Sequence, residues 1–266
     1  MNLPRTLSLA LLTAAWLGPP VPAWAQGFNA VVSPPRFEVT ATPGGRARHV
    51  VEISNAGSQP ARYKIRTADW SLGQDASVTF YDDLRPGSCR PWVAIERSDL
   101  IIPGGARVRF RFEIAPPADA PAGECRFALM IEGDEPAVAG SDAIKIPVRG
   151  RIGVIVYAAV GDAAPKLEIV KAEVATIAGK RVPALVVRNT GNAHGRLGGF
   201  LSGTDALGRE LEFAPSTFPV LPGETRSLEL SAQSSRNERI DAALPVTVSG
   251  TLEWAGSRVP FEHHFE

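Results

Sequence analysis

Four histidines are the residues best suited to metal or acid–base chemistry in this chain. His263 and His264 are neighbours, and neighbouring side chains on a strand point to opposite faces, so the pair could not chelate one ion. His49 and His194 are single and have no companions at metal-ligand spacing. The motifs of serine hydrolases, zinc metalloproteases and phosphate-binding loops are also absent from the sequence. We therefore expect no metal site, no cofactor and no enzyme activity.

Arg36 is the side chain best suited to hold an anionic group. It stands in the segment Ser33–Val39 (SPPRFEV), where two prolines favour an extended strand at the edge of a sheet. Its planar guanidinium offers five donors that match a carboxylate. The alternative is an ordinary surface arginine on an edge strand, and composition alone favours that alternative.

The longest apolar strand candidate is Ala143–Tyr157, which presents Ile144, Ile146 and Val148 on one face. Pro147 cannot donate a backbone hydrogen bond, so it fits an edge strand better than a fully paired central strand. One interpretation is a docking edge that adds to a partner's sheet. The other is the last strand of a sandwich, crossing to a second domain.

The first 25 residues have the pattern of a secretory signal peptide. Arg5 precedes the apolar run Leu7–Leu17, and Ala23–Ala25 (AWA) has the small-x-small pattern of a cleavage site. We predict cleavage after Ala25 and export from the cytoplasm. A retained signal anchor is the alternative, although about 11 apolar residues are short for a membrane span. No later stretch is long enough to span a membrane.

Cys89 and Cys125 are the only cysteines of the chain and lie 36 positions apart. Two cysteines in an exported protein most often pair, and no CxxC motif points to a reactive thiol instead. Closing a loop of this length would stabilise the fold by roughly 3–4 kcal/mol in the loop-entropy account. We predict a structural disulfide between them.

The charge and the length of the chain limit its partners and its domain count. The 28 basic and 28 acidic residues balance. Nucleic acids and anionic membranes select a basic surface, so we expect neither as a partner. A length of 266 residues predicts one large domain or two small ones.

The apolar pattern has a period of two residues, which is typical of strands. Arg107–Ile114 (RVRFRFEI) alternates charged, mostly basic, and apolar residues over its whole length, as an antiparallel strand with one solvent-exposed face does. Turn signals such as Pro43-Gly44-Gly45 separate short strands at the spacing of a β-sandwich. No segment has the pattern of a three-turn amphipathic helix. We predict an all-β fold.

One plan appears twice along the chain. His49–Gly57 and Pro183–Gly191 are each a strand that ends in Asn-x-Gly. Leu100–Phe112 and Val220–Leu230 are each a Pro-Gly turn followed by an alternating strand. We predict two immunoglobulin-like β-sandwich domains in tandem, at residues 26–158 and 159–266. The first copy is longer, and we place its extra residues within 69–91.

These features together resemble the PapD-like periplasmic chaperones of pilus assembly. The likeness rests on the signal peptide with two unequal repeats, on Arg36 in the first strand, on the turn and strand at Pro103–Phe110, and on the long Ile/Val strand. The resemblance implies a periplasmic protein that binds pilin-like subunits and that also meets an outer-membrane usher. It also implies that Ile144, Ile146 and Val148 complete the subunit's sandwich, which is donor-strand complementation.

The resemblance implies a site for the subunit's C-terminal carboxylate, formed by Arg36 and a lysine at the end of the long strand. In register, Gly153 occupies the position of that lysine. Arg151, two residues earlier on the same face, could substitute for it. The disulfide has no counterpart among the family's hallmarks. These departures leave open a PapD-like protein that no longer acts as a pilin chaperone.

Two other classes of function are left open. A structural or adhesion-type pair of immunoglobulin-like domains in an envelope complex would need no exposed donor strand, and it would be indifferent to Arg36. A carbohydrate-binding module or an enzyme would use exposed aromatic side chains. One such cluster lies in the enlarged part of the first domain: Trp70, Phe80, Tyr81 and Trp92. Aromatic side chains like these are more often core.

Overall fold

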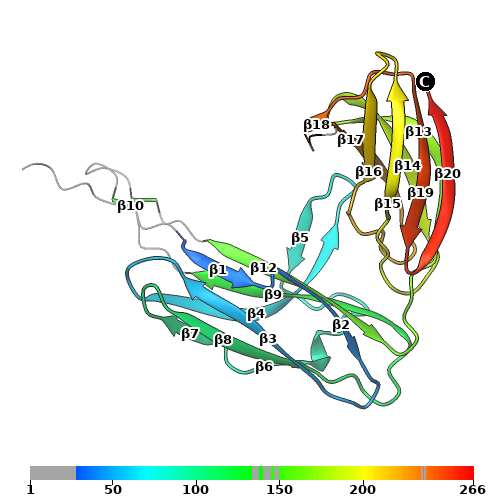
Figure 1. Cartoon of the computed structure of the whole chain (residues 1–266). Helices are drawn as coiled ribbons and strands as arrows, with labels where there is room; N and C mark the ends of the chain where they lie inside the picture. The colour runs from blue at the N-terminus through cyan, green and yellow to red at the C-terminus, as the bar shows by residue number, and fades with distance from the viewer. Residues whose placement is uncertain (1–27, 134–137, 140–144, 147–149, 235, 237) are drawn as a thin grey trace, which may run out of the picture.

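The computed structural model describes residues 28–133, 138–139, 145–146, 150–234, 236 and 238–266. Within these ranges the chain folds as two β-sandwiches set at an angle to one another (Figure 1). The only helix among the described residues is a single 3-10 turn, η1 (Arg90–Trp92). No helix in this part of the chain is long and apolar enough to cross a membrane. The predicted fold class, two tandem immunoglobulin-like sandwiches, is confirmed, whereas the predicted signal peptide lies outside the described residues.

The first sandwich packs a four-stranded sheet against a six-stranded sheet. The smaller sheet has the order β1–β3–β8–β6, with bounds Ala30–Ser33, Ala47–Asn55, Arg107–Ile114 and Val93–Ile95. The larger sheet has the order β2–β12–β9–β4–β5, and β7 also pairs with β4. Its bounds are Arg36–Ala41, Arg151–Val160, Gly123–Gly133, Ala61–Leu72, Val78–Tyr81 and Asp99–Ile102.

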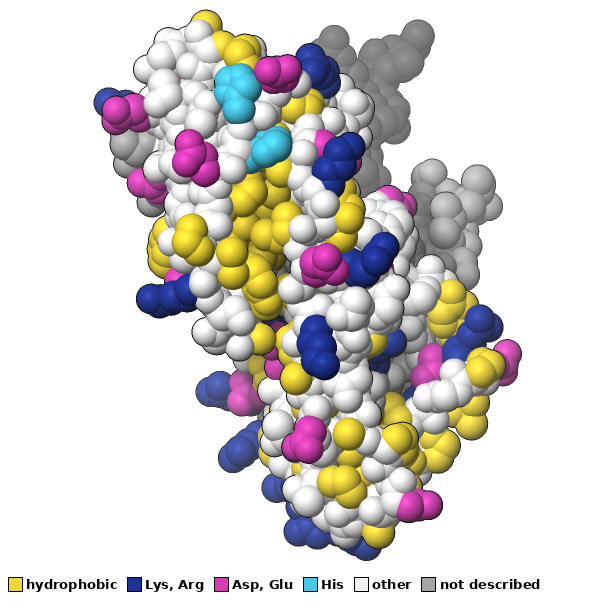
Figure 2. Space-filling view, turned by 90° about the vertical axis from the view of Figure 1, so that its right-hand side faces the viewer, with side chains coloured by type: hydrophobic (Ala, Val, Ile, Leu, Met, Phe, Trp, Pro, Cys, Tyr) yellow, Lys and Arg dark blue, Asp and Glu magenta, His cyan; other side chains and the backbone are white. Residues whose placement is uncertain are grey.

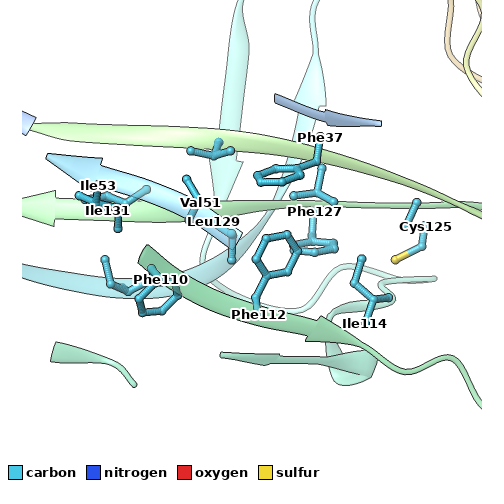
Figure 3. Close-up of a cluster of buried hydrophobic side chains, with 14 of the residues drawn as sticks. Phe37, Val51, Ile53, Phe110, Phe112, Ile114, Cys125, Phe127, Leu129 and Ile131 are labelled. Carbon is cyan, nitrogen blue, oxygen red and sulfur yellow. The ribbon is translucent and has the colours of Figure 1, made fainter. Parts of the chain in front are cut away.

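Strict alternation along the strands builds the core of this sandwich. In β8, Phe110, Phe112 and Ile114 are buried, while Arg107, Arg109 and Arg111 are exposed. Figure 3 shows these side chains meeting Phe127 of β9 and Phe37 of β2 between the two sheets. The rings of Phe37 and Phe112 pack edge-to-face with centroids 5.1 Å apart. The two sheets therefore share one apolar layer.

The predicted disulfide between Cys89 and Cys125 is confirmed. Cys89 directly precedes η1, Cys125 lies in β9, and their Cα atoms are 5.7 Å apart. Both residues are buried. The bond therefore fastens the loop before β6 to the larger sheet.

The second sandwich is an eight-stranded sheet that folds over its own core, in the order β13–β14–β17–β16–β15–β19–β20, with β18 paired to β17. In that order the bounds are Leu167–Ile177, Lys180–Asn189, Thr225–Gln233, Glu210–Pro215, Gly198–Asp205, Val246–Trp254 and Ser257–Phe265, and β18 is Arg239–Ile240. Residues 161–166 connect the end of β12 to the start of β13.

The two end strands of the second sheet leave part of its core uncovered. Ile169 and Val174 of β13 and Phe261 of β20 are only partly buried against that core. Figure 2 shows a strip of hydrophobic side chains on the second domain, on the side that carries these end strands. In the first domain the last strand, β12, is instead covered by β2. The two domains therefore differ in that the end strands β13 and β20 leave the second core partly uncovered, whereas β12 in the first domain is covered by β2.

β4 and β5 form a hairpin that reaches the second domain (Figure 1). Its tip, between β4 and β5, includes Gly73 and Gln74. Arg226 of β17 is buried and donates hydrogen bonds to the carbonyl oxygens of Gly73 at 2.9 Å and Gln74 at 3.3 Å. The hairpin therefore connects the first domain to the second through these hydrogen bonds.

The apolar stretch expected as one strand from Ala143 to Tyr157 is divided in the structure. β11 (Lys145–Ile146) pairs with β10 (Val138–Ala139) in a ladder of its own, and β12 begins only at Arg151. Residues 147–149, which separate the two strands in the sequence, lie outside the described residues. Of the predicted donor residues, Ile146 ends β11, whereas Ile144 and Val148 lie outside the described residues.

Candidate functional site

Arg36 begins β2, the end strand of the six-stranded sheet, and stands opposite Ile155 of β12 in parallel register. The next residue, Phe37, belongs to the core, so Arg36 and Glu38 point to the outer face of the sheet. The Arg36 side chain is 49% exposed, and its Nε lies 2.9 Å from Glu38 Oε1. Glu38 is its one ion-pair partner among the described residues, so Arg36 has donors to offer to another acceptor.

Arg151 lies on the same outer face but not beside Arg36. It lies four positions before Ile155, which is about 13 Å along the strand. Gly153 lies between them, and a Cβ added there would stand 2.4 Å from Phe80 Cζ. The Arg151 guanidinium lies 6.0 Å from the centroid of the same Phe80 ring. A lysine at position 153 would therefore have to displace Phe80, whose ring lies between the two predicted anchors.

An apolar cluster covers the middle of this outer face. Ala68, Ala128 and Met130 are fully buried there, beneath the half-buried side chains of Trp70, Phe80 and Ile155. Phe80 belongs to β5, so the hairpin supplies part of this cover. Of the four aromatic side chains noted in the sequence, Trp70 and Phe80 therefore pack in a small second core.

The end of the outer face that carries Arg36 meets the second domain. His194, in the loop between β14 and β15, stacks on Tyr157 of β12 with ring centroids 3.9 Å apart. Its Nδ1 pairs closely with Glu124 Oε2, and its Nε2 lies 3.6 Å from Glu38 Oε1. The His194 side chain is 11% exposed. One histidine of the second domain is therefore enclosed by three side chains of the first.

Three arginines surround the same tyrosine. Tyr157 pairs with Arg126 on β9 and with Glu38 on β2. Arg36 lies two residues before Glu38 on the same face of β2. Arg196 belongs to the second domain. Its Nε lies 3.3 Å from Glu38 Oε1, and its Cζ lies 5.8 Å from the centroid of the Tyr157 ring. Burial raises the pKa of the Tyr157 phenol, and the charges of the three arginines oppose that rise.

We call this group the junction cluster; its members are Arg36, Glu38, Glu124, Arg126, Tyr157, His194 and Arg196. A cavity of about 530 Å³ opens beside it, between β2, β12 and the linker. Three arginines face two carboxylates in the cluster, so it carries a surplus of positive charge. Chemically it suits an anionic group that arrives at the angle between the domains.

Most of the junction cluster could not be found from the sequence. His194 has no companion at short spacing, because Glu124 is 70 positions away along the chain. Only the pairing of β2 with β12 and the docking of the second domain bring these residues together. Among the described residues, no group of three or more His, Cys, Asp or Glu is arranged to hold a metal ion.

The sequence matches no protein-family model and no curated protein. Several solved structures are similar to the fold of this chain. The class 5 fimbriae chaperone CfaA has a TM-score of 0.49 at 12% identity, over 90% of this chain and 99% of that chain. The SafB chaperone, solved with the Salmonella enterica SafA pilin, has a TM-score of 0.48 at 12% identity, over 90% of this chain and 97% of that chain. The E. coli chaperone DraB has a TM-score of 0.47 at the same identity and coverage.

All three structures are of chaperones; the first is a chaperone of class 5 fimbriae, and the second was solved in complex with a pilin. None of these values assigns a function to this chain.

Proposed function

We propose that this chain is a periplasmic chaperone that binds and caps pilin-like subunits by donor-strand complementation, before they are assembled into a surface appendage with an outer-membrane usher. The observation that carries the proposal is a free stretch of strand edge next to Arg36. β2 pairs with β12 only from Ile155 to Val160. From Arg151 to Val154, no strand pairs with this side of β12 within the described residues.

The direction of an added strand follows from the position of Arg36. A strand that fills the free edge lies in line with β2, ahead of its first residue. If the C-terminus of that strand reaches Arg36, the strand runs in the direction of β2 and therefore parallel to β12. Its terminal carboxylate then meets the guanidinium of Arg36, and main-chain hydrogen bonds along β12 hold the rest of it.

The physical benefit to the subunit is protection of an unfinished sheet. A β-sandwich that lacks one strand exposes apolar core and bare strand edges, which pair with other chains and aggregate. β12 offers backbone partners for such a gap, and the apolar residues that precede it in the sequence, Ile144, Ile146 and Val148, would supply the alternating side chains. The pair between Arg36 and Glu38 is half-exposed and therefore weak, so an incoming carboxylate competes with it at small cost.

The experiment that tests the proposal is co-purification of the tagged protein with subunits from the periplasm of its native host, followed by mass spectrometry. We expect small β-rich subunits to be captured by the unaltered protein and to be lost, by tenfold or more, from Arg36→Ala. The matched control is Arg107→Ala, because Arg107 is an exposed arginine of the same domain that pairs with Glu52 at 3.3 Å on the other sheet.

The thermal midpoint of Arg36→Ala should stay within about 2 °C of the unaltered protein, because a half-exposed ion pair adds little stability. Two results would count against the proposal. One is capture of a large envelope protein that is indifferent to Arg36, which would favour a structural role. The other is a fall of many degrees in the midpoint of Arg36→Ala with capture intact, which would make Arg36 a structural residue.

A further inference from the structure

The outer face of the smaller sheet of the first domain carries a concentration of arginines. Side chains of β3 and β8 alternate between the core and the solvent, and the residues that point outward lie opposite one another in register. This face, with the loop residues at its rim, holds six arginines and three glutamates: Arg46, Arg48, Arg97, Arg107, Arg109, Arg111, Glu52, Glu96 and Glu113. We call this group the arginine face. The end strands β1 and β6 add no charged residue to it.

The three glutamates of the arginine face are already engaged by its arginines. Glu113 accepts hydrogen bonds from Arg46 at 3.0 Å and from Arg48 at 2.7 Å. The other ion pairs of the face are Arg97–Glu96 at 2.8 Å, Arg111–Glu96 at 3.4 Å and Arg107–Glu52 at 3.3 Å. Each guanidinium has five donors, and these pairs use only part of them. The chain as a whole is neutral, so this face holds a local surplus of positive charge with donors to spare.

Arg109 stands in the middle of the face without a partner. It lies opposite Glu52 in register, but Glu52 pairs with Arg107, and the Arg109 side chain makes no ion pair or hydrogen bond within the part of the chain that the structure describes. Together with Arg107 and Arg111 it forms a row along β8, in which side chains two residues apart are separated by about 6.8 Å. The face therefore presents three guanidinium groups at a regular spacing.

A hollow of about 380 Å³ lies beside this row. Its lining includes the small apolar side chains of Val50 and Ala94 and, at its rim, those of Arg48 and Arg111. Val50 lies opposite Arg111 and Ala94 lies opposite Glu113, so the hollow is on the same outer face. Ala94, Arg48 and Arg111 are exposed, so the hollow is open to solvent. The face can therefore seat the main chain of a partner between long arginine side chains.

The pattern of charges distinguishes an anionic membrane from a protein partner. A lipid surface is negative throughout, so its headgroups would face the three glutamates as well as the arginines, and like charges repel. A protein segment has its carboxylates at fixed positions and can set neutral residues against the glutamates. In an extended segment every second side chain points the same way, also at a spacing of about 6.8 Å. Charge and spacing together fit an extended protein segment.

We propose that the arginine face binds an extended, acidic segment of a partner protein, with Asp or Glu at every second position. The carboxylates pair with Arg107, Arg109 and Arg111, whose planar guanidinium groups match a carboxylate with two parallel hydrogen bonds. The main chain of the segment lies over this row and continues into the hollow above Val50 and Ala94. Exposed charge pairs of this kind govern specificity and association rate more than affinity, and salt screens them.

This surface is separate from the free edge of β12. The arginine face belongs to the smaller sheet, whereas β12 lies in the larger sheet, on the other side of the core. Binding at the arginine face needs no subunit, so its failure would leave the chaperone proposal standing. Equally, loss of subunit capture in Arg36→Ala would say nothing about the arginine face, which does not contain Arg36.

The test is fluorescence anisotropy of labelled synthetic peptides with the purified mature protein. One peptide has six Glu-Thr repeats; the other has three Glu-Glu-Thr-Thr repeats, the same composition with twice the spacing between carboxylates on one side. We expect saturable binding of the alternating peptide that weakens several-fold between about 20 and 150 mM salt, and binding of the second peptide at least threefold weaker. No binding, or equal binding of both peptides, would overturn the proposal. Binding of phosphatidylglycerol vesicles without peptide binding would overturn it in favour of a membrane.

Two variants with opposite expected effects locate the binding. Arg109→Glu should weaken binding of the alternating peptide by about three- to tenfold and keep the thermal midpoint, because Arg109 gives up no ion pair. Glu52→Gln should strengthen binding by about twofold, because it removes a negative charge from the face. The matched control is Arg62→Glu, at an exposed arginine of the larger sheet that lies 3.8 Å from Asp99. Unchanged affinity in Arg109→Glu, or an equal loss in Arg62→Glu, would place the binding elsewhere and overturn the proposal.

Discussion

At the scale of single residues, a buried asparagine performs the same task in each domain. Asn189 Nδ2 donates to the carbonyl oxygens of Ala193 and Val220, each at 2.8 Å, and Asn189 O accepts from Gly223 N at 2.9 Å. Asn55 does the same in the first domain, donating to Gln59 O at 2.7 Å and to Ile102 O at 3.1 Å. The repeated Asn-x-Gly and Pro-Gly segments are therefore two turns tied together by one side chain.

Asn189→Ala should lower the free energy of unfolding of the second domain by about 2–4 kcal/mol, because it leaves buried carbonyl and N–H groups without partners. Denaturant unfolding measures the change. The control is Thr190→Ala, since Thr190 is the exposed neighbour and its side-chain hydroxyl makes a long hydrogen bond, at 3.5 Å, to Lys166 O. Equal stability of the two variants would mean that the asparagine does not hold the turns.

Asp205 makes the second domain sensitive to acid. Its buried carboxylate accepts hydrogen bonds from the Arg209 guanidinium at 2.6 Å and from the backbone N–H groups of Leu207 and Ala243. Arg209 and these N–H groups hold the pKa of Asp205 well below its ordinary value of 3.8. Because the folded-state pKa is lowered, the carboxylate contributes stability above about pH 4, and that contribution is lost as the pH falls below this value.

Asp205→Asn should therefore destabilise the protein by about 2–3 kcal/mol at pH 7 and should flatten the fall in stability between about pH 4 and pH 2. Urea unfolding at a series of pH values measures both effects. Asp119→Asn, at an exposed position of the first domain, is the control and should leave the profile as it is. If Asp205→Asn keeps the full fall in stability at low pH, other carboxylates cause that fall.

At the scale of elements, β12 has two different edges along its length. From Ile155 onward both sides are paired, with β9 and β2, whereas from Arg151 to Val154 only the β9 side is paired among the described residues. The sheet is thus complete near the junction and open further from it. Because its edge is already open over this stretch, β12 can accept another strand without the loss of an existing strand pairing.

If the apolar residues before β12 enter a subunit, Ile146→Asp should weaken complex formation by tenfold or more and leave the thermal midpoint of the free protein nearly unchanged. The reason is that a charge would be buried in the subunit's core only in the complex. Pull-down of the subunit and a thermal scan of the free chain measure the two quantities. Ile101→Asp, at an isoleucine of β7 that is 56% exposed, is the control. If the free Ile146→Asp protein unfolds, Ile146 belongs to the core of this chain and not to the interface with a subunit.

At the scale of the whole molecule, two separate contacts set the angle between the domains. One is His194, held by Glu124 and Glu38 against Tyr157. The other is Arg226, which donates to the hairpin tip and also pairs with Glu224 at 2.5 Å. Contacts at two well-separated places resist rotation far better than one, so we expect the pair of sandwiches to move as one body.

Arg226→Ala should release the hairpin tip and loosen the angle. We expect a larger radius of gyration in small-angle X-ray scattering and faster amide exchange at residues 72–78, with a loss of about 1–2 kcal/mol in stability, because the part-buried hydrogen bonds to the hairpin tip are lost. Arg188→Ala, at an exposed arginine of the neighbouring strand β14, is the control. Unchanged scattering would mean that the His194 contact alone fixes the angle.

The sequence by itself determined the features that depend on neighbouring residues. Period-two alternation predicted the strands, the Asn-x-Gly and Pro-Gly segments predicted the repeated turns, and the two cysteines predicted the disulfide. Side-chain direction along a strand and the backbone preference of a turn are local properties, so they can be read without knowing the fold.

Only the tertiary structure decided which residues meet. The junction cluster needs Glu38, Glu124 and His194 at one place, and strand register and domain docking bring them there. The ring of Phe80 over Gly153 and the free edge of β12 are likewise set by pairing between distant segments. No local pattern encodes such distances, because a strand's partner is selected by the packing of the whole core rather than by the strand's own residues.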